Sequence, residues 1–331
     1  MSGQSNLGPL QKIVVGAQFL FVAFGATALV PLLIGLDPSV ALLTAGTGTL
    51  IFHAVTKGKV PIFLGSSFAF IAPIIKATEL YGLPGTLFGL IGVGLVYGLM
   101  SLLIRLRGVG FISRLFPPVV IGPVIMLIGL SLASTGVDMA KTNWALAIIS
   151  LLTTVVITLF GKGMLKLIPI FAGIVVGYVI SIILGHVDFQ PVLDATWFAL
   201  PAFVRPELCW EAIIFMIPVA IAPVIEHIGD VYAINEVTGK DYVKDPGLHR
   251  TMIGDGLACI ASSIIGGPPV TTYSEVTGAV SLTKIADPAV IRIAAVFGLL
   301  FSILGKVSAL LKTIPDAVLG GIMLLLFGTI A

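Results

Sequence analysis

The chain alternates long apolar runs with short polar stretches along nearly its whole length. A helix needs about 20 apolar residues to cross a bilayer, and that length divides the sequence into twelve apolar segments. We therefore expect an all-α protein that crosses a membrane many times. The segments are residues 11–35, 39–55, 60–77, 83–104, 112–135, 144–161, 164–185, 211–234, 250–266, 268–284, 287–311 and 315–331.

Two of these segments, 60–77 and 268–284, are interrupted. The first contains a Gly-Ser-Ser break, and the second begins with two prolines that are followed by the extended-chain formers Val-Thr-Thr-Tyr. We expect a short helix to start near Phe68 and another near Ser274. Paired interruptions, one in each half of a chain, are typical of a transporter's substrate site. For each segment alone, a Gly or Pro kink in an ordinary span is the other interpretation.

Composition supports a membrane protein and excludes several other classes. Of the 331 residues, 57% are hydrophobic and 10% are charged, and the mean hydropathy is +1.13, whereas soluble domains carry about 25% charged residues. The net charge is only +2 and no basic tract is present, so we expect no nucleic-acid partner. Cys209 and Cys259 lie far apart in apolar surroundings, which favours two buried, reduced thiols with no disulfide and no metal.

The distribution of basic residues predicts the orientation. With the N-terminus in the cytoplasm, 13 of the 18 lysines and arginines fall on the cytoplasmic side, as the positive-inside rule requires. This alternation needs the interrupted segment 268–284 to count as a full crossing. The chain stops inside an apolar run at 327–331, without the polar flank that usually ends a span. We therefore expect a fragment of a longer protein, truncated after about twelve segments.

Carboxyl groups inside apolar segments are costly and indicate function. Glu226 and Asp230 are four residues apart and share a helix face, whereas His227 points about 100° away. For Asp230 an interfacial position near the helix end is equally compatible with the sequence. For Glu226 a ligand or a proton is the expected partner, because no lysine or arginine lies at similar depth. We expect His227 to be a packing or interfacial residue rather than a ligand. Glu275 opens the helical part of the second interrupted segment.

Glu226 and Glu275 together define the candidate site. Two carboxyls that share a site of low dielectric cannot both ionise at low cost, so we expect at least one to be protonated near neutral pH. The helix starts at Phe68 and Ser274 offer free N–H groups that suit carbonyl oxygens. Acceptors and donors in this arrangement complement a flat dione such as a pyrimidine or purine, on which the ring of Phe68 or Tyr273 could stack.

Four motifs resemble the uracil permease branch of the nucleobase–ascorbate transporter family, and the resemblance extends from Gln18 to Leu325. They are Gly-Ser-Ser-Phe-Ala-Phe-Ile-Ala-Pro at 65–73, Glu-His-Ile-Gly at 226–229, Asp-Pro-Gly-Leu-His-Arg at 245–250 and Thr-Thr-Tyr-Ser-Glu at 271–275.

The resemblance implies fourteen spans in two inverted repeats of seven, divided into a core domain and a gate domain, with the last two gate spans beyond this sequence. It also makes a homodimer plausible. The implied parts are 10–106, first half of the core; 107–208, first half of the gate; 209–312, second half of the core; and 313–331, the start of the second gate half.

The resemblance further implies roles for individual residues. Glu226 would hold the imide of uracil, the amides of Phe68 and Ser274 would hold its carbonyls, and Glu275 would complete the site and couple it to a proton. The sequence departs from the family pattern at three positions: Val276 replaces the usual Asn, Phe19 replaces the His of a Gln-His pair, and Asp230 stands where His can occur. The proton route could therefore run through Asp230.

The resulting prediction is a proton-coupled nucleobase importer of the cell (inner) membrane, with uracil as substrate and with the proton as coupling ion in place of any cofactor. The runner-up is a xanthine or urate permease, although that pattern carries Gln in place of Glu275. An anion exchanger or channel on the same architecture is a second class, but two buried acids without a basic residue are unfavourable for an anion. An enzyme is not expected, because the chain shows no nucleophile–base or metal-ligand constellation.

Overall fold

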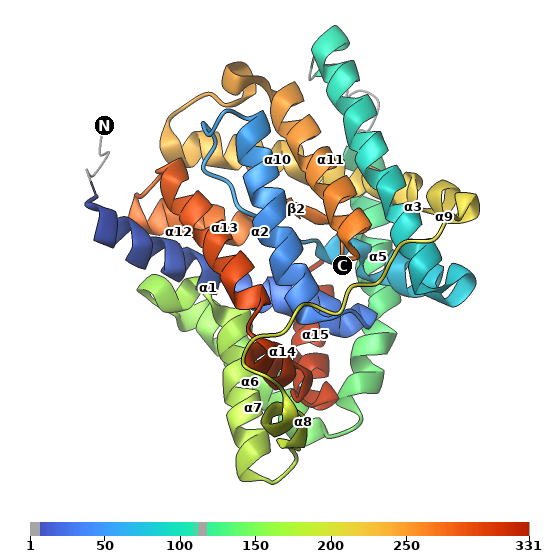
Figure 1. Cartoon of the computed structure of the whole chain (residues 1–331), viewed down its shortest axis with the longest axis vertical. Helices are drawn as coiled ribbons and strands as arrows, with labels where there is room; N and C mark the ends of the chain where they lie inside the picture. The colour runs from blue at the N-terminus through green and yellow to red at the C-terminus, as the bar shows by residue number, and fades with distance from the viewer. Residues whose placement is uncertain (1–6, 109, 112–117, 331) are drawn as a thin grey trace.

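The computed structural model describes residues 7–108, 110–111 and 118–330, and these residues are predominantly helical (Figure 1). The first half contains α1 (Pro9–Ile34), α2 (Pro38–Val55), β1 (Leu64–Ser66), η1 (Phe68–Phe70), α3 (Ile71–Arg107), α5 (Pro118–Ala140), α6 (Trp144–Phe160), η2 (Gly163–Leu167), α7 (Pro169–Ile183) and α8 (Gln190–Asp194). The second half contains α9 (Trp210–Met216), η3 (Pro218–Ala220), α10 (Ile221–Thr238), η4 (Val243–Gly247), α11 (Leu248–Ile265), β2 (Val270–Thr272), α12 (Ser274–Thr283), α13 (Pro288–Ser302), α14 (Gly305–Lys312) and α15 (Asp316–Ile330).

Capping residues explain where several helices begin and end. Asp37 accepts a hydrogen bond from the Ser39 amide at 2.9 Å, and Pro38 occupies the first helical position of α2. Asp287 and Pro288 form the same arrangement at the start of α13. Gly35 ends α1 with φ of 74°, a left-handed conformation that glycine adopts without a steric cost. The sequence-based starts of the segments at 39 and 287 are therefore confirmed.

The two interrupted segments meet at the centre of the molecule. β1 and β2 pair antiparallel, with Leu64 opposite Thr272 and Ser66 opposite Val270. The Ser67 amide extends this ladder by donating to the Pro269 carbonyl at 3.0 Å. A short helix follows each strand: η1 starts at Phe68 and α12 starts at Ser274. The predicted interruptions and both predicted helix starts are thus confirmed.

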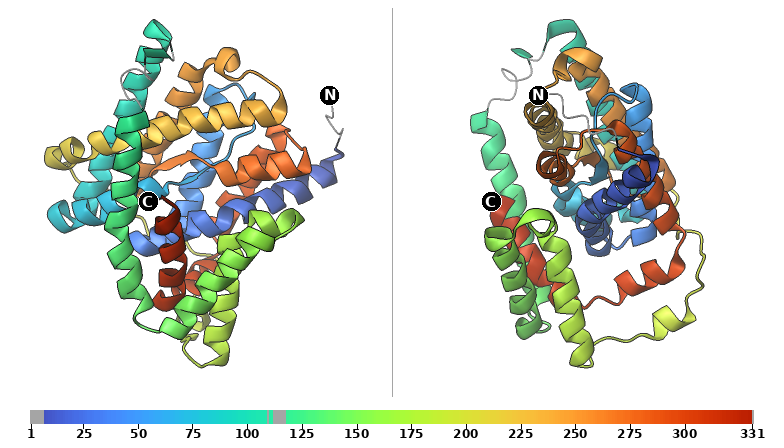
Figure 2. Two further views of the ribbon diagram at one scale, coloured as in Figure 1. Left: turned by 180° about the vertical axis from the view of Figure 1, so that it is seen from behind. Right: turned by 90° about the vertical axis from the view of Figure 1, so that its left-hand side faces the viewer.

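The helices pack in two groups (Figure 2). In one group α11 lies against α2 and α3, and α13 lies against α1 and α2. In the other, α15 lies against α5, α6 and α7, and the right-hand view of Figure 2 shows these green and red helices beside the rest. The largest buried apolar cluster belongs mainly to the first group, and a second cluster lies where α1 and α2 meet α6, α7 and α15.

Two segments differ from the sequence-based expectation, and the start of a third is not described. The expected single segment 287–311 is wrong, because α13 ends at Ser302 and α14 begins at Gly305. The segment 211–234 is divided into α9, η3 and α10 around Pro218, which cannot donate a backbone hydrogen bond. Residues 112–117, the start of the expected segment 112–135, lie outside the described residues, and α5 begins at Pro118.

By length and hydropathy alone, four helical stretches in the described residues could cross a membrane, or five if the bent pair α14 and α15 counts as one span. They are Pro9–Ile34, Pro38–Val55, Phe68–Arg107 and Trp210–Thr238. Within α3, Gly82 has non-helical φ and ψ of 71° and 163°, so two helical pieces meet there, as the separate segments 60–77 and 83–104 predict. Three shorter apolar helices, α6, α7 and α13, add to the apolar surface. The chain is a multi-pass membrane protein, and the number of twelve crossings stays a prediction.

Candidate substrate site

Helix α10 carries the two acids that the sequence places on one face. Glu226 and Asp230 lie one turn apart, and α10 packs against both β2 and α12. The carboxyl groups of Glu226, Asp230 and Glu275 are close enough to interact electrostatically. Neither α10 nor α12 contains a lysine or arginine. The structure therefore brings three acids from two elements to one place without a basic residue from either helix.

Of the five residues expected to contact a ligand, all but Tyr273 remain accessible. Glu226 and Ser274 are exposed, and Phe68 and Glu275 are partly buried. Phe68 and Ser274 are the first residues of η1 and α12, so neither amide has a carbonyl one turn earlier to receive its hydrogen bond. Two amide donors and two accessible carboxyl groups thus surround the β1–β2 pair.

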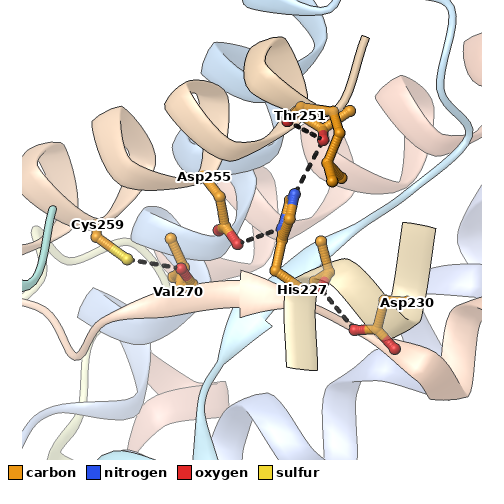
Figure 3. Close-up of polar contacts among 8 residues, drawn as sticks. His227, Asp230, Thr251, Asp255, Cys259 and Val270 are labelled. Atoms are coloured by element: carbon orange, nitrogen blue, oxygen red, sulfur yellow. Dashed lines mark hydrogen bonds and ion pairs between the residues drawn. The ribbon is translucent and has the colours of Figure 1, made fainter. Parts of the chain in front are cut away.

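Asp230 is buried, with only 7% of its surface exposed, and its carboxylate accepts a hydrogen bond of 2.5 Å from the Thr272 hydroxyl (Figure 3). Thr272 is the last residue of β2. Asp230 is therefore an internal partner of the interrupted segment. Its depth in the membrane and its part in proton coupling stay predictions.

His227 points away from Glu226, toward α11. Its Nδ1 lies 2.8 Å from Oδ2 of Asp255, and its Nε2 lies 3.0 Å from the hydroxyl oxygen of Thr251 (Figure 3). All three residues are fully buried. The expectation of a packing histidine is confirmed. The sequence analysis missed Asp255, although a carboxyl inside the apolar segment 250–266 is itself the signal that would have revealed it.

Tyr273 holds the two strands together. Its hydroxyl donates to the Ser66 carbonyl at 2.7 Å, its amide donates to the Phe63 carbonyl at 3.1 Å, and only 4% of its surface is exposed. Its ring covers Gly65, where an added Cβ would come within 2.3 Å of a ring carbon. Of the two aromatic rings considered for stacking, Phe68 is the one with accessible surface.

Gly65→Ala is expected to lower the free energy of unfolding by about 1–3 kcal/mol, because the Tyr273 ring must move to admit the methyl group. Gly229→Ala is the matched control, since an added Cβ at Gly229 meets nothing within 4 Å. Thermal unfolding of the purified variants measures both effects. Equal unfolding temperatures for the two variants would show that the ring does not pack tightly on Gly65.

Two departures from the family pattern lie in the apolar interior. Val276, in the first turn of α12, and Phe19, in α1, are fully buried and belong to the largest apolar cluster. Each side chain therefore contributes packing at a position where the pattern usually has a polar group.

The sequence comparisons identify related proteins. A family model described as the permease family, Xan_ur_permease, matches residues 10–331. A probable uracil permease of Haemophilus influenzae is 53% identical over 98% of this chain and 81% of that protein. The uracil permease of Bacillus subtilis is 44% identical over 98% of this chain and 79% of its own length, and that of Escherichia coli K12 is 40% identical over 99% and 79%. These relatives are permeases and not enzymes.

The fold is also similar to that of solved membrane transporters. The transmembrane domain of the cyanobacterial bicarbonate transporter BicA superposes with a TM-score of 0.73 over 97% of this chain and 89% of that one, at 16% identity. SLC26A9 gives a TM-score of 0.65 over 97% and 57%, at 13% identity. Identities this low concern the fold alone. The match of the family model and the identity to the permeases, both over nearly the whole sequence, show that the chain belongs to the nucleobase–ascorbate transporter family of permeases.

Proposed function

We propose that this protein imports uracil together with protons. The observation that carries the proposal is the meeting of Glu226 and Glu275 beside two helix starts, Phe68 and Ser274, in a chain whose relatives are named uracil permeases. A planar imide presents one N–H group between two carbonyl groups, and this site offers acceptors and donors in the complementary arrangement.

Each group has a proposed role in holding the base. The Glu226 carboxylate accepts a hydrogen bond from the imide N–H, and charge-assisted hydrogen bonds of this kind are among the stronger ones in proteins. The Phe68 and Ser274 amides donate to the two carbonyl oxygens. The Phe68 ring supplies an apolar face for stacking. Tyr273 acts through the backbone, because its hydroxyl fixes Ser66, two residues before the first helix start.

The three neighbouring acids provide a path for proton coupling. Their negative charges repel one another, and a proton taken up by one acid lowers that repulsion. Uptake of a proton therefore stabilises the site that holds the neutral base. Glu275 faces the proposed ligand position, and Asp230 connects α10 to β2 through Thr272. We propose that Glu275 and Asp230, with Glu226, exchange the coupling proton, and that no other cofactor is required.

The architecture that we propose is the family's inverted repeat of seven spans. The pairing of β1 with β2 supports it, since each strand occupies the same position relative to the short helix that follows. The two packing groups support a core domain made of 10–106 and 209–312 and a gate domain made of 107–208 with 313–331. We further propose residence in the cell (inner) membrane with a cytoplasmic N-terminus, and a homodimer as the assembled form.

Two other substrates deserve comparison with uracil. Xanthine or urate is the nearest alternative within the family, and the acid at Glu275 favours the pyrimidine. A bicarbonate-type anion is suggested by the similarity in fold to BicA. The acids Glu226, Asp230 and Glu275 make the site repulsive to an anion, because like charges at close range cost several kcal/mol in low dielectric.

A binding competition on the purified protein tests this ranking. Unlabelled uracil is expected to displace labelled uracil at least about 100-fold more effectively than xanthine, since an ill-fitting hydrogen-bonding partner leaves buried polar groups unpaired. Bicarbonate is expected to displace none. Preferential displacement by xanthine would favour the purine permease, and displacement by bicarbonate would favour the anion transporter.

A further inference from the structure

A recess separate from the candidate substrate site opens between the C-terminal end of α3 and the N-terminal end of α11. These two helices run side by side (Figure 1). The recess has a volume of about 480 Å³, within the range of small-ligand sites. Its lining residues are Val55, Gly98, Ser101, Leu102, Arg105, His249, Arg250 and Ile253.

Glycines on α3 shape the space beside α11. At Gly94 an added Cβ would lie 2.5 Å from the Gly256 carbonyl oxygen, so the backbones nearly touch there. One turn further along α3, at Gly98, the nearest atom is Cδ1 of Ile253 at 3.7 Å, so the missing side chain leaves space there. Beyond Gly98, the Ser101 hydroxyl donates to the His249 carbonyl at 2.6 Å and connects the two helices beside the opening.

The recess is positively charged. Arg105 and Arg250 both lie close enough to His249 to interact with it electrostatically. Within the described residues neither arginine forms an ion pair, whereas Lys59 is paired with Asp245. Two unpaired guanidinium groups that border one opening are a suitable site for a phosphate group.

Exposed apolar side chains lie at helical spacing from each arginine, on the same helix. On α3, Leu102, Leu99 and Leu95 follow Arg105 at spacings of three and four residues, and all three are exposed. On α11, Leu257 and Ile264 follow Arg250 and are 42% and 58% exposed. A free anion would leave this surface uncovered, but the acyl chains of a lipid would cover it.

We propose that this recess binds one anionic phospholipid, with the phosphate between Arg105 and Arg250 and the acyl chains along the α3 and α11 leucines. The choice of lipid follows from charge complementarity, because the quaternary ammonium of phosphatidylcholine would face two guanidinium groups. Phosphatidylglycerol carries the phosphate without that cation. The site is independent of Glu226 and Glu275, so the proposal does not depend on the transported substrate.

Thermal unfolding of the detergent-purified protein, titrated with phosphatidylglycerol, tests the proposal. The double variant Arg105→Gln/Arg250→Gln is expected to weaken the apparent lipid affinity about thirtyfold. Each basic residue near an anionic head group raises the affinity about five- to sixfold. The matched control, Arg107→Gln/Lys244→Gln, removes the same charge outside the recess, because Arg107 lies over the Phe111 ring and Lys244 is exposed. Its affinity is expected to remain that of the parent.

Further measurements distinguish the alternatives. Phosphatidylcholine and glycerol 3-phosphate are expected to give no shift in unfolding temperature with the parent protein. A full shift with glycerol 3-phosphate would mean a site for a free anion, and an equal shift with phosphatidylcholine would mean non-specific solvation by lipid. Should the double variant not fold, Gly98→Leu fills the recess while retaining both arginines and is expected to remove most of the phosphatidylglycerol shift. An unchanged shift in Gly98→Leu would overturn the proposal.

Discussion

Replacing Glu226 by glutamine or alanine is expected to abolish measurable uracil binding. The carboxylate is the acceptor for the imide N–H in the proposed site, and the loss of one charge-assisted hydrogen bond of 1.5–3 kcal/mol weakens binding by about 10- to 150-fold. Because the imide N–H would then lie in the site without an ionised acceptor, the loss is expected at the upper end of that range. Equilibrium binding of labelled uracil to the purified protein measures it.

Glu236→Gln is the matched control for this prediction. Glu236 lies on the same helix, α10, and is exposed on the part remote from β2. Removing Glu226 also removes a negative charge near Asp230 and Glu275, so the unfolding temperature of Glu226→Gln is expected to equal or exceed that of the parent. Retained uracil affinity in a folded Glu226→Ala variant would contradict the proposed role of Glu226 in binding uracil.

Replacing Glu275 by glutamine is expected to abolish uptake driven by a proton gradient. The amide keeps the size of the side chain and its place in the first turn of α12, but it cannot gain or lose a proton. Uptake of labelled uracil into proteoliposomes with an imposed pH gradient is expected to fall to the level of empty vesicles. Exchange of labelled for unlabelled uracil, which needs no net proton movement, is expected to persist.

The comparison of Glu275→Gln with Asp230→Asn assigns the proton. Asparagine at 230 can still accept the hydrogen bond from Thr272 through its carbonyl oxygen, so the contact between α10 and β2 is expected to remain. If Asp230 takes part in the coupling, this variant also loses gradient-driven uptake and keeps exchange. Gradient-driven uptake at the parent rate in both variants would contradict proton coupling through these acids.

The features that the sequence revealed are those with a local chemical cause. The prolines at 268 and 269 interrupt a helix, and the Gly-Ser-Ser stretch before Phe68 disfavours one. Both interruptions and the helix starts after them were therefore predictable. The grouping of Glu226 with Asp230 followed from helical spacing alone.

The features that the sequence concealed depend on contacts between distant elements. The hydrogen bond of His227 with Asp255 joins α10 to α11, and nothing adjacent to either residue specifies the other. The role of Tyr273 depends on the absence of a side chain at Gly65, which lies on the other strand. The boundary between α13 and α14 at Ser302–Gly305 lies in an apolar run without a proline, so hydropathy gave no warning of it.

The antiparallel pairing of β1 with β2 restricts how the protein can present its ligand to the two sides of a membrane. Separating Phe68 from Ser274 would require breaking the ladder between residues 64–66 and 270–272 and removing the Tyr273 hydroxyl from Ser66. Hydrogen bonds buried away from water are costly to break. Access from each side would therefore require the strand pair and its two short helices to move as a unit past the group formed by α5, α6, α7 and α15. A cross-link between β1 and β2 would then leave transport unimpaired. A cross-link between the two groups of helices would stop it.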